Sequence, residues 1–296
     1  MQPLVPICQR DFVTVNSVLQ AGNRVGNLGS LQYIFRLEAE VDTQQQFGRI
    51  GMSAGDPYGS ERRTYEHSYV RSLFDRIAPR YDFLNHFLSA GFDIRWRKKA
   101  VALLREYEPK TVLDVATGTA DLALEAAKLN AVRIYGVDIS PAMLEFARHK
   151  IERHGLSHTI TVEEGTAEHL RFPDDTFDAV MVAFGIRNFS NLQQGLSEMF
   201  RVLRPGGPVM ILEFSKPRRA PFKQVYSFYF THVLPLLGGA ISKNREAYQY
   251  LPSTVESFPD GEHLVRILTG EGFVGPYYLP LTMGIATIYI AEKPTH

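Results

Sequence analysis

Residues 111–138 constrain the fold of this chain more than any other segment. An apolar run over 111–115 is followed by a turn at Gly118 and by a helical pattern that reaches Leu129. A second apolar run then ends in Asp138, about 20 residues after the glycine. A strand, a glycine turn, a helix and a second strand that ends in an acid form the nucleoside-binding half of a doubly wound α/β sheet.

The residue types around the turn indicate which nucleoside fits. This loop has a single glycine, Gly118, where dinucleotide-binding loops have the three glycines of G-x-G-x-x-G. It also lacks the G-K-[ST] ending of a P-loop. Both motifs bring the backbone against phosphates, so this loop favours a cofactor without phosphate, such as S-adenosylmethionine. Asp138 would accept hydrogen bonds from the ribose, and Asp114 would favour the ammonium group directly or through water. A plain βαβ unit with an incidental turn glycine is the alternative.

The rest of the chain alternates between strand and helix patterns, as α/β folds do. Strands are predicted over residues 111–115, 133–138, 160–163, 177–184, 208–214, 273–280 and 283–292. Helices are predicted over residues 69–85 with an interruption at Pro79, 94–107, 119–129, 141–154 behind a Ser140 cap, 191–203 and 260–271. Seven strands with an antiparallel last pair and helices on both faces suit a Rossmann-like class I methyltransferase, an α/β fold that uses S-adenosylmethionine.

Two parts of the chain depart from this alternation. Residues 1–66 mix short apolar runs with Gly, Asn, Gln and Ser, so we predict a poorly ordered N-terminal extension there. Met52 precedes a flexible stretch and is a second candidate for the first residue of the natural protein. The methyltransferase domain is expected over 67–296, with an aromatic-rich helical insert at about 217–258.

Composition argues against several classes of protein. Basic and acidic residues number 32 each, so net charge gives no indication of a nucleic-acid partner. Cys8 is the single cysteine, which excludes an internal disulfide network and a cysteine-rich metal site, and Gly155 separates His154 from His158, so no metal is expected. No apolar run reaches about 18 residues, and the N-terminus shows no basic-then-apolar signal pattern. We therefore expect a cytoplasmic protein without a membrane span.

Several independent motifs occur in the same order as in one known family. They are FDRIAPRYDFLN at 74–85, PDDTFD at 173–178, AFGIRN at 183–188, EFSKP at 213–217 and AYQYLP at 247–252. From about Tyr69 to Lys293 the chain resembles the ubiquinone/menaquinone biosynthesis C-methyltransferase family. The resemblance implies methyl transfer from S-adenosylmethionine to a ring carbon of a polyprenylated quinol.

The resemblance also implies cofactor contacts. They are Thr119 in the first loop, Asp138 after the second strand, and Thr166 with Ala167 after the third. Part of the family has a cofactor-binding serine where this chain has Ala183, so that contact is not carried over. Thr117 replaces a glycine that is commoner in the family, and it fits only if its backbone φ is negative.

The chemistry of the implied reaction assigns further roles. Removing a phenolic proton enriches the adjacent ring carbon in electrons, so the enzyme needs a proton acceptor and a group that stabilises the phenolate. We assign Arg187 as the stabiliser, since its guanidinium is too basic to serve as a base, and Asn188 as the group that orients the substrate. Tyr81 would close over the site. A structural ion pair is the alternative for Arg187, and packing is the alternative for the base candidates Tyr248 and His232.

The acceptor is predicted to be demethylmenaquinol, which becomes menaquinol. The stretch 183–189, with Ser242, Lys243 and 258–262, resembles menaquinone-type members more closely. C-methylation of 2-methoxy-6-polyprenyl-1,4-benzoquinol in ubiquinone biosynthesis is the alternative within the family. An unrelated small-molecule methyltransferase and a non-catalytic, cofactor-binding partner in a quinone-synthesis complex also stay open.

Two segments bear on partners other than the quinol. The basic cluster Arg95, Arg97, Lys98 and Lys99 is either a solvated helix face or a contact with anionic lipid. The aromatic segment 222–241 either packs into the core or forms an apolar groove for the substrate tail. With a polyprenylated substrate we expect transient contact with the inner face of the membrane and no nucleic acid; a homodimer is left open.

Overall fold

The computed structural model describes residues 66–129, 131, 133–218, 220–221, 223–224 and 245–295, without the side chains of Leu84, Phe87, Leu88 and 245–249. The chain divides into two units, Met1–Pro57 and Tyr58–His296, and the described residues all belong to the second. The predicted N-terminal extension, except for residue 66, and the predicted alternative start at Met52 therefore lie outside the described residues.

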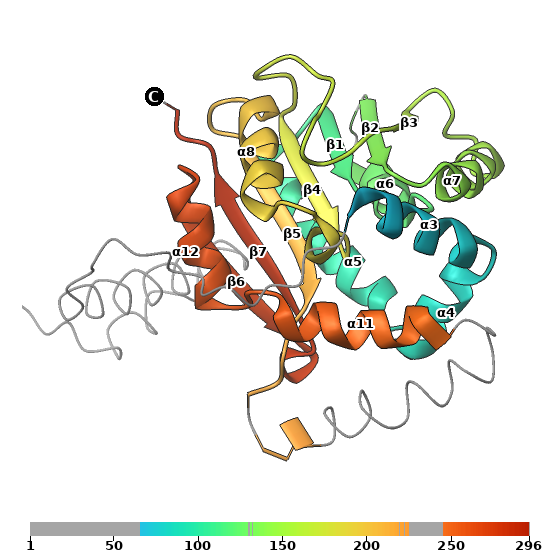
Figure 1. The fold of residues 1–296 in the computed structure, drawn as a ribbon. Coiled ribbons are helices and arrows are strands. Elements are labelled where there is room, and N and C mark those ends of the chain that lie inside the picture. Colours follow the sequence, from blue (N-terminus) through green and yellow to red (C-terminus); the bar gives the residue numbers. More distant parts are fainter. Residues whose placement is uncertain are drawn as a thin grey trace, which may run out of the picture. The chain divides into compact units, whose positions relative to one another are not determined.

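Seven strands form one sheet in the order β3-β2-β1-β4-β5-β7-β6 (Figure 1). Their bounds are Thr111–Val115 (β1), Arg133–Asp138 (β2), Ile160–Glu164 (β3), Ala179–Ala183 (β4), Pro208–Phe214 (β5), Val274–Leu281 (β6) and Ala286–Glu292 (β7). Strands β1 to β5 pair in parallel, and β7 runs antiparallel to both β5 and β6. This confirms the predicted α/β class and its seven-stranded sheet with a closing hairpin.

Helices cover both faces of the sheet. The α-helices are His67–Ile77 (α3), Tyr81–Leu88 (α4), Phe92–Leu104 (α5), Asp121–Ala126 (α6), Pro141–Arg153 (α7), Leu192–Val202 (α8), Arg245–Ser257 (α11) and Glu262–Gly270 (α12). Short 3₁₀-helices are Ala78–Arg80 (η2), Arg105–Tyr107 (η3), Ala127–Leu129 (η4), Ile186–Asn188 (η5) and Thr282–Gly284 (η7). Helices α5, α6 and α7 share one core cluster with the sheet, and α8 and α12 share the cluster on the opposite face.

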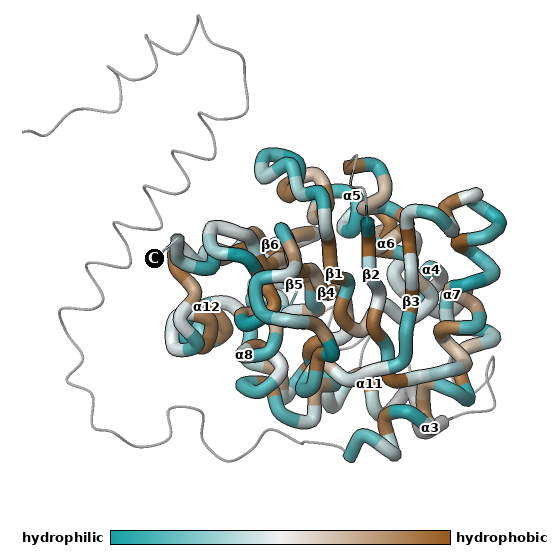
Figure 2. The backbone as a smooth tube through the Cα atoms, turned by 90° about the horizontal axis from the view of Figure 1, so that it is seen from above, coloured by the Kyte–Doolittle hydropathy of each residue, from teal (hydrophilic) through white to brown (hydrophobic). Residues whose placement is uncertain are grey.

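The alternation of side chains along each strand produces these two clusters. Val112 of β1 joins the α5–α7 cluster, and its neighbour Leu113 joins the α8–α12 cluster, because successive strand residues point to opposite faces. The inner strand β4 is therefore apolar along its whole length, and its neighbours β1 and β5 are mainly apolar (Figure 2). As predicted, Ser140 caps α7, its hydroxyl accepting a hydrogen bond from the Met143 backbone N–H at 3.1 Å.

The strand order places a ligand-binding crevice at one point of the sheet. The chain runs outward from β1 through β2 to β3, and outward from β4 through β5 in the other direction, so β1 and β4 are neighbours at a topological switch point. In open α/β sheets, ligands bind outside the carboxyl ends of the strands at this point. The loops after β1, β2 and β4 are therefore where a cofactor is expected.

Three further expectations concern the helical insert, a membrane span and the basic cluster on α5. Within the predicted helical insert, α11 is described, whereas His232 and residues 225–244 as a whole lie outside the described residues. No helix in the described part of the chain is long and apolar enough to cross a membrane. The prediction of a solvated basic face was wrong for Arg97, which is buried and pairs with Asp93 at 2.6 Å and Asp121 at 3.2 Å.

Candidate functional site

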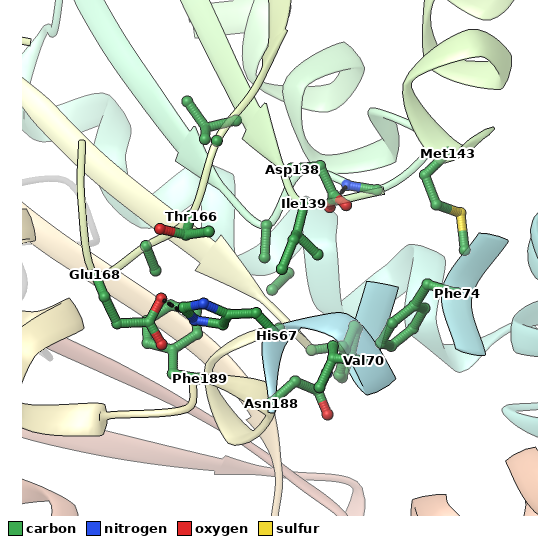
Figure 3. A pocket seen from close by; sticks show the side chains of 18 of the residues that line it. His67, Val70, Phe74, Asp138, Ile139, Met143, Thr166, Glu168, Asn188 and Phe189 are labelled. Atoms are coloured by element: carbon green, nitrogen blue, oxygen red, sulfur yellow. Dashed lines mark hydrogen bonds and ion pairs between the residues drawn. The ribbon is translucent and has the colours of Figure 1, made fainter. Parts of the chain in front are cut away.

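A pocket opens at the carboxyl edge of the sheet, where the loops after β1, β2, β3 and β4 meet the N-terminal helices (Figure 3). Its empty volume is about 630 Å³ when the open solvent at its mouth is included. Six of the predicted site residues line it: Tyr81, Gly118, Asp138, Thr166, Ala167 and Asn188. The structure thus brings together residues from segments more than a hundred positions apart in the sequence.

Asp138 lines this pocket at the end of β2. Its Oδ2 accepts a hydrogen bond from the Gly118 backbone N–H at 2.8 Å, and its Oδ1 accepts one from the Ser140 backbone N–H at 2.9 Å. A carboxylate oxygen can accept more than one hydrogen bond, so both oxygens keep capacity for ribose hydroxyls. Burial raises the pKa of Asp138 to about 6, and the two backbone donors oppose that rise.

The first loop turns sharply between β1 and α6. Ala116, Gly118 and Ala120 all have positive φ, at 54°, 56° and 67°, whereas Thr117 does not, so the condition for Thr117 in this loop is met. Two alanines in the left-handed region are unusual and store strain, which structures commonly keep at functional loops. The turn aims the Gly118 N–H at Asp138 and so joins the loops after β1 and β2.

An apolar slot lies beside the acid. Val137 and Ile139 flank Asp138, Met143 comes from α7, and Thr166 and Ala167 come from the loop after β3. Apolar walls with a few convergent polar groups suit an adenine ring joined to a ribose. The slot, the acid and the free acceptor capacity together fit S-adenosylmethionine.

Helices α3 and α4 cover the pocket, which the sequence did not predict for α3. Val70 and Phe74 belong to an apolar stripe of α3, and both line the pocket. The Asp75 carboxylate accepts a hydrogen bond from the Ser140 hydroxyl at 2.6 Å, which holds α3 against the start of α7. His67 Nε2 lies 3.1 Å from Glu168 Oε2, and both residues line the pocket (Figure 3).

Tyr81 lies at the join between the cover and the first loop. A Cβ placed on Gly118 would stand 3.8 Å from Tyr81 Cε1, so the ring lies directly over the glycine. Burial raises the pKa of Tyr81, and the positive charge of Arg187 opposes that rise. Tyr81 therefore keeps its O–H near neutral pH and offers a hydrogen-bond donor rather than a base.

Thr119 and Asp114, both predicted to contact the cofactor, form hydrogen bonds with other residues of the protein instead. The Thr119 hydroxyl donates to Asp82 of α4 and lies 3.2 Å from Lys150 Nζ. Asp114 is buried under the first loop, where its Oδ2 accepts a hydrogen bond from the Thr117 hydroxyl at 2.6 Å. Neither residue lines the pocket. Burial raises the pKa of Asp114 to about 7.

Arg187 and Asn188 follow β4 but face different surroundings. The Arg187 guanidinium is buried, donates to Glu213 Oε1 at 2.7 Å and lies 5.4 Å from the centre of the Phe214 ring. The alternative weighed for Arg187, an ion pair with a structural acid, is thus present, and Arg187 does not line the pocket. Asn188 does line it, and its Oδ1 accepts a hydrogen bond from Tyr250 of α11 at 2.9 Å.

Comparisons with known proteins bear on the fold and on the family. The structure resembles an S-adenosylmethionine-dependent methyltransferase from Thermotoga maritima, with a TM-score of 0.53, 21% identity and coverage of 75% of this chain and 99% of that one. It also resembles the phosphoethanolamine N-methyltransferase 2 of Haemonchus contortus in complex with S-adenosyl-L-methionine, with a TM-score of 0.52, 16% identity and coverage of 76% and 60%. At these identities the likeness establishes the fold, the predicted class I methyltransferase fold.

Sequence relatives are much closer. The chain is 50% identical over 234 residues to the ubiquinone/menaquinone biosynthesis C-methyltransferase UbiE of Geobacter sulfurreducens, covering 78% of this chain and 91% of the relative. It is 48% identical over 223 residues to the demethylmenaquinone methyltransferase of Thermus thermophilus, covering 75% and 100%. It is 44% identical over 238 residues to the demethylmenaquinone methyltransferase of Bacteroides fragilis, covering 80% and 96%.

The family model of the ubiE/COQ5 methyltransferase family matches residues 62–293, which include both the pocket and its cover. The predicted family and the predicted cofactor are thereby confirmed. The chain belongs to the ubiE/COQ5 methyltransferase family, and it is a C-methyltransferase that uses S-adenosylmethionine.

Proposed function

We propose that this protein transfers a methyl group from S-adenosylmethionine to a ring carbon of demethylmenaquinol and so produces menaquinol. The observation that carries the proposal is one pocket that joins Asp138, after β2, to Asn188, after β4. A cofactor bound at Asp138 and a quinol held at Asn188 would meet in it. The high identity to relatives named demethylmenaquinone methyltransferase supports this acceptor.

C-methylation of 2-methoxy-6-polyprenyl-1,4-benzoquinol in ubiquinone biosynthesis is the second candidate, since the Geobacter sulfurreducens relative is named for both quinones. One assay separates the two: purified protein, labelled S-adenosylmethionine, and reduced naphthoquinol or benzoquinol acceptors. Label in the naphthoquinol product supports the proposal, and label in the benzoquinol product alone would replace it with the second candidate. Label in neither, with cofactor binding intact, would favour a non-catalytic partner in a quinone-synthesis complex.

The chain's own residues account for binding and charge. When bound, S-adenosylmethionine supplies an electrophilic methyl group. We assign Asp138, Gly118, Thr166 and Ala167 to the cofactor, with Asp138 on the ribose. Thr119 and Asp114 would support the cofactor indirectly. Thr119 would hold α4 over the pocket through Asp82, and Asp114 would hold the first loop through Thr117.

The substrate side needs a stabilised phenolate. In the overall change the ring carbon gains a methyl group and releases a proton, and negative charge develops on the phenolic oxygen on the way. We assign Asn188 and Tyr81 as hydrogen-bond donors to that oxygen, since both line the pocket. Arg187 would add a fixed positive charge from below, held in place by Glu213. The base is unassigned, because His232 and the side chain of Tyr248 lie outside the described residues.

A polyprenylated substrate also requires the protein to reach a membrane, and α5 offers a surface for that contact. Phe92 and Ile94 are 37% and 41% exposed, and Arg95, Lys98 and Lys99 are exposed on the same helix. Asp93 is buried, so this stretch presents three cations and no exposed carboxylate. Such a face is attracted to anionic lipid and can insert its apolar side chains.

The neighbouring η7 extends this surface. The Trp96 indole N–H donates to the Thr282 hydroxyl at 2.8 Å, which holds η7 beside α5, and Met283 is 66% exposed. We therefore propose that a cytoplasmic protein meets the inner membrane face through α5 and η7. The homodimer stays a candidate, which sedimentation velocity of the full chain would test.

Vesicle sedimentation tests the membrane contact. Lys98→Glu/Lys99→Glu should lower binding to vesicles rich in anionic lipid by more than tenfold, because each cation near such a surface contributes about 1 kcal/mol. Arg148→Glu/Arg153→Glu on α7 makes the same change in charge at exposed positions away from α5 and serves as the control. Equal losses in both double variants would contradict the α5 surface.

A further inference from the structure

Tyr250 is a residue of the AYQYLP motif for which the proposed function has no role. It lies on α11, is only 6% exposed, and donates its hydroxyl hydrogen to Asn188 Oδ1 at 2.9 Å. Asn188 lies on η5 and lines the pocket. The contact therefore joins the wall of the catalytic pocket to a helix that is distant in the sequence.

In this hydrogen bond the Asn188 amide presents its oxygen to the Tyr250 hydroxyl. A carboxamide has one acceptor end and one end with two N–H donors. Because the oxygen faces the Tyr250 hydroxyl, the Nδ2 end is left for a ligand in the pocket. Without that hydroxyl the amide could turn over, and it would then present an oxygen lone pair to the ligand.

Both partners are held in place by other contacts. The Asn188 backbone N–H donates to the Gly185 carbonyl at 2.9 Å, which fixes the start of the side chain. The Tyr250 ring lies 6.0 Å from the ring of Tyr69, at 52° to it, so α3 packs against this side chain. A donor that is already oriented before the ligand arrives loses little entropy on binding.

We propose that Tyr250 is a positioning residue for methyl transfer, which it serves by turning the donor end of the Asn188 amide toward the ring oxygen of the quinol. The inference rests on the proposed function. Negative charge develops on that oxygen when its proton leaves, and an N–H donor stabilises the charge, whereas a reversed amide would repel it. The pair lowers the pKa of the bound quinol and raises the fraction that can accept the methyl group.

The test compares the rate of quinol methylation with pH in wild type and in Tyr250→Phe, which removes only the hydroxyl. We expect the midpoint of the rise of kcat with pH to move upward by about one unit, so that kcat falls about tenfold below the midpoint. At pH values above both midpoints the two rates should converge. The KM for S-adenosylmethionine should stay near wild type, since Tyr250 is not among the residues at Asp138.

Two further variants sharpen the result. Asn188→Asp keeps an acceptor for Tyr250 but replaces the donors by a second oxygen, so kcat should fall by more than 100-fold at every pH where the carboxylate is ionised. Tyr107→Phe removes a hydroxyl that donates to Glu292 at 2.8 Å on another part of the sheet, and it should leave the pH profile unchanged.

An unchanged midpoint in Tyr250→Phe would overturn the inference. The same holds for a fall in kcat that is equal at all pH values, since this is what a merely structural role would produce. Wild-type protein that binds S-adenosylmethionine but methylates neither naphthoquinol nor benzoquinol would instead overturn the proposed function itself. An active wild type whose Tyr250→Phe profile is identical leaves that function intact and removes only the role of Tyr250.

Discussion

Lys150 on α7 donates a hydrogen bond to the Asp82 carboxylate on α4 at 2.8 Å, so a helix packed on the sheet holds the cover of the cofactor pocket. Thr119 donates to the same carboxylate, and Lys150 also contacts Asp121 at the start of α6. The polar residues around the first loop are thus joined to α4, and under the proposed function they would influence the cofactor through that helix. This arrangement explains why Thr119 has no place in the pocket lining although the resemblance implied a direct contact.

Lys150→Ala should weaken binding of S-adenosylmethionine about fivefold, because losing this partly buried hydrogen bond costs about 1 kcal/mol and loosens α4. Isothermal titration calorimetry measures the affinity directly. Lys128→Ala is the matched control, since within the described residues the exposed Lys128 forms an ion pair with the neighbouring Glu125 alone. Equal affinities in wild type and Lys150→Ala would show that the hydrogen bond between Lys150 and Asp82 is not needed to keep α4 over the pocket.

The affinity for S-adenosylmethionine should fall as pH drops below about 6. Burial raises the pKa of Asp138 to about 6, and only the ionised carboxylate offers all its lone pairs to the ribose and to the two backbone donors. Each pH unit below that value should cost up to tenfold in affinity. Asp138→Asn should bind about 10 to 100 times more weakly at pH 8 and lose the dependence between pH 5 and pH 7, as calorimetry would detect. A variant that keeps the wild-type pH dependence would contradict the assignment.

Asp114→Asn should become more stable than wild type as pH rises. Burial raises the pKa of Asp114 to about 7, so the folded protein keeps a proton that the unfolded chain has released between about pH 4 and pH 7. The stability that this proton supplies is complete below the unfolded pKa and is lost as pH rises through 7. The upper limit of the gain from asparagine is about 4 kcal/mol, from about three pKa units at 1.36 kcal/mol each.

Urea unfolding at pH 5 and pH 8 would test this expectation. The difference in free energy of unfolding between Asp114→Asn and wild type should grow in favour of the variant at pH 8. A difference that is constant with pH would mean that Asp114 does not keep its proton in the fold.

The buried pair of Arg187 and Glu213 should respond differently to single and double substitution. Glu213→Gln should destabilise the protein by about 3 to 5 kcal/mol, because it leaves a buried guanidinium without its counter-charge. Arg187→Met/Glu213→Gln should recover part of that loss in urea unfolding. Methylation should stay low in the double variant, since the positive charge that acts on Tyr81 is gone, while cofactor affinity should stay near wild type. Recovery of turnover together with stability would limit Arg187 to a structural role.

Gly185→Ala should disturb the pocket from the substrate side. A Cβ at this position would stand 2.5 Å from the Ala116 Cβ, so the loops after β1 and β4 would have to separate. We expect at least a tenfold loss of cofactor affinity by calorimetry and a destabilisation of about 1 to 3 kcal/mol. Gly270→Ala is the control, because no atom of the described residues outside its own helix lies within 4 Å of the Cβ added there. Normal affinity in Gly185→Ala would argue against close contact between the two loops as a requirement for binding.

The sheet could be predicted from sequence because its signals are local. Alternating apolar runs and the turn at Gly118 define β1 and β2 to the residue, and the Ser140 cap with Pro141 defines the start of α7. The antiparallel β7 was also predictable, because only a short turn, too short for a crossover helix, separates the last two apolar runs of the chain.

Side-chain partners were harder to predict, because they depend on tertiary distance. Nothing near Arg187 in the sequence points to Glu213, which lies 26 positions later and meets it only because β4 and β5 are neighbours. In the sequence Arg97 belongs to a basic run that is typical of an exposed helix face. In the structure it is buried and pairs with Asp93 and Asp121. The cover helix α3 carried an apolar stripe that serves a pocket and a core equally well, so periodicity alone could not separate these roles.

The contacts that hold the cover also impose an order on its assembly. Helices α3 and α4 are synthesised before the sheet, yet their anchors Ser140 and Lys150 come 65 and 68 residues later than Asp75 and Asp82. During translation these two helices therefore cannot dock on the sheet through Ser140 and Lys150 until α7 has left the exit tunnel of the ribosome. Until then Val70 and Phe74 lack the contacts that they make in the folded protein. A chain arrested before Lys150 has the turn at Gly118 and the acid at Asp138 but no means of closing over a nucleoside.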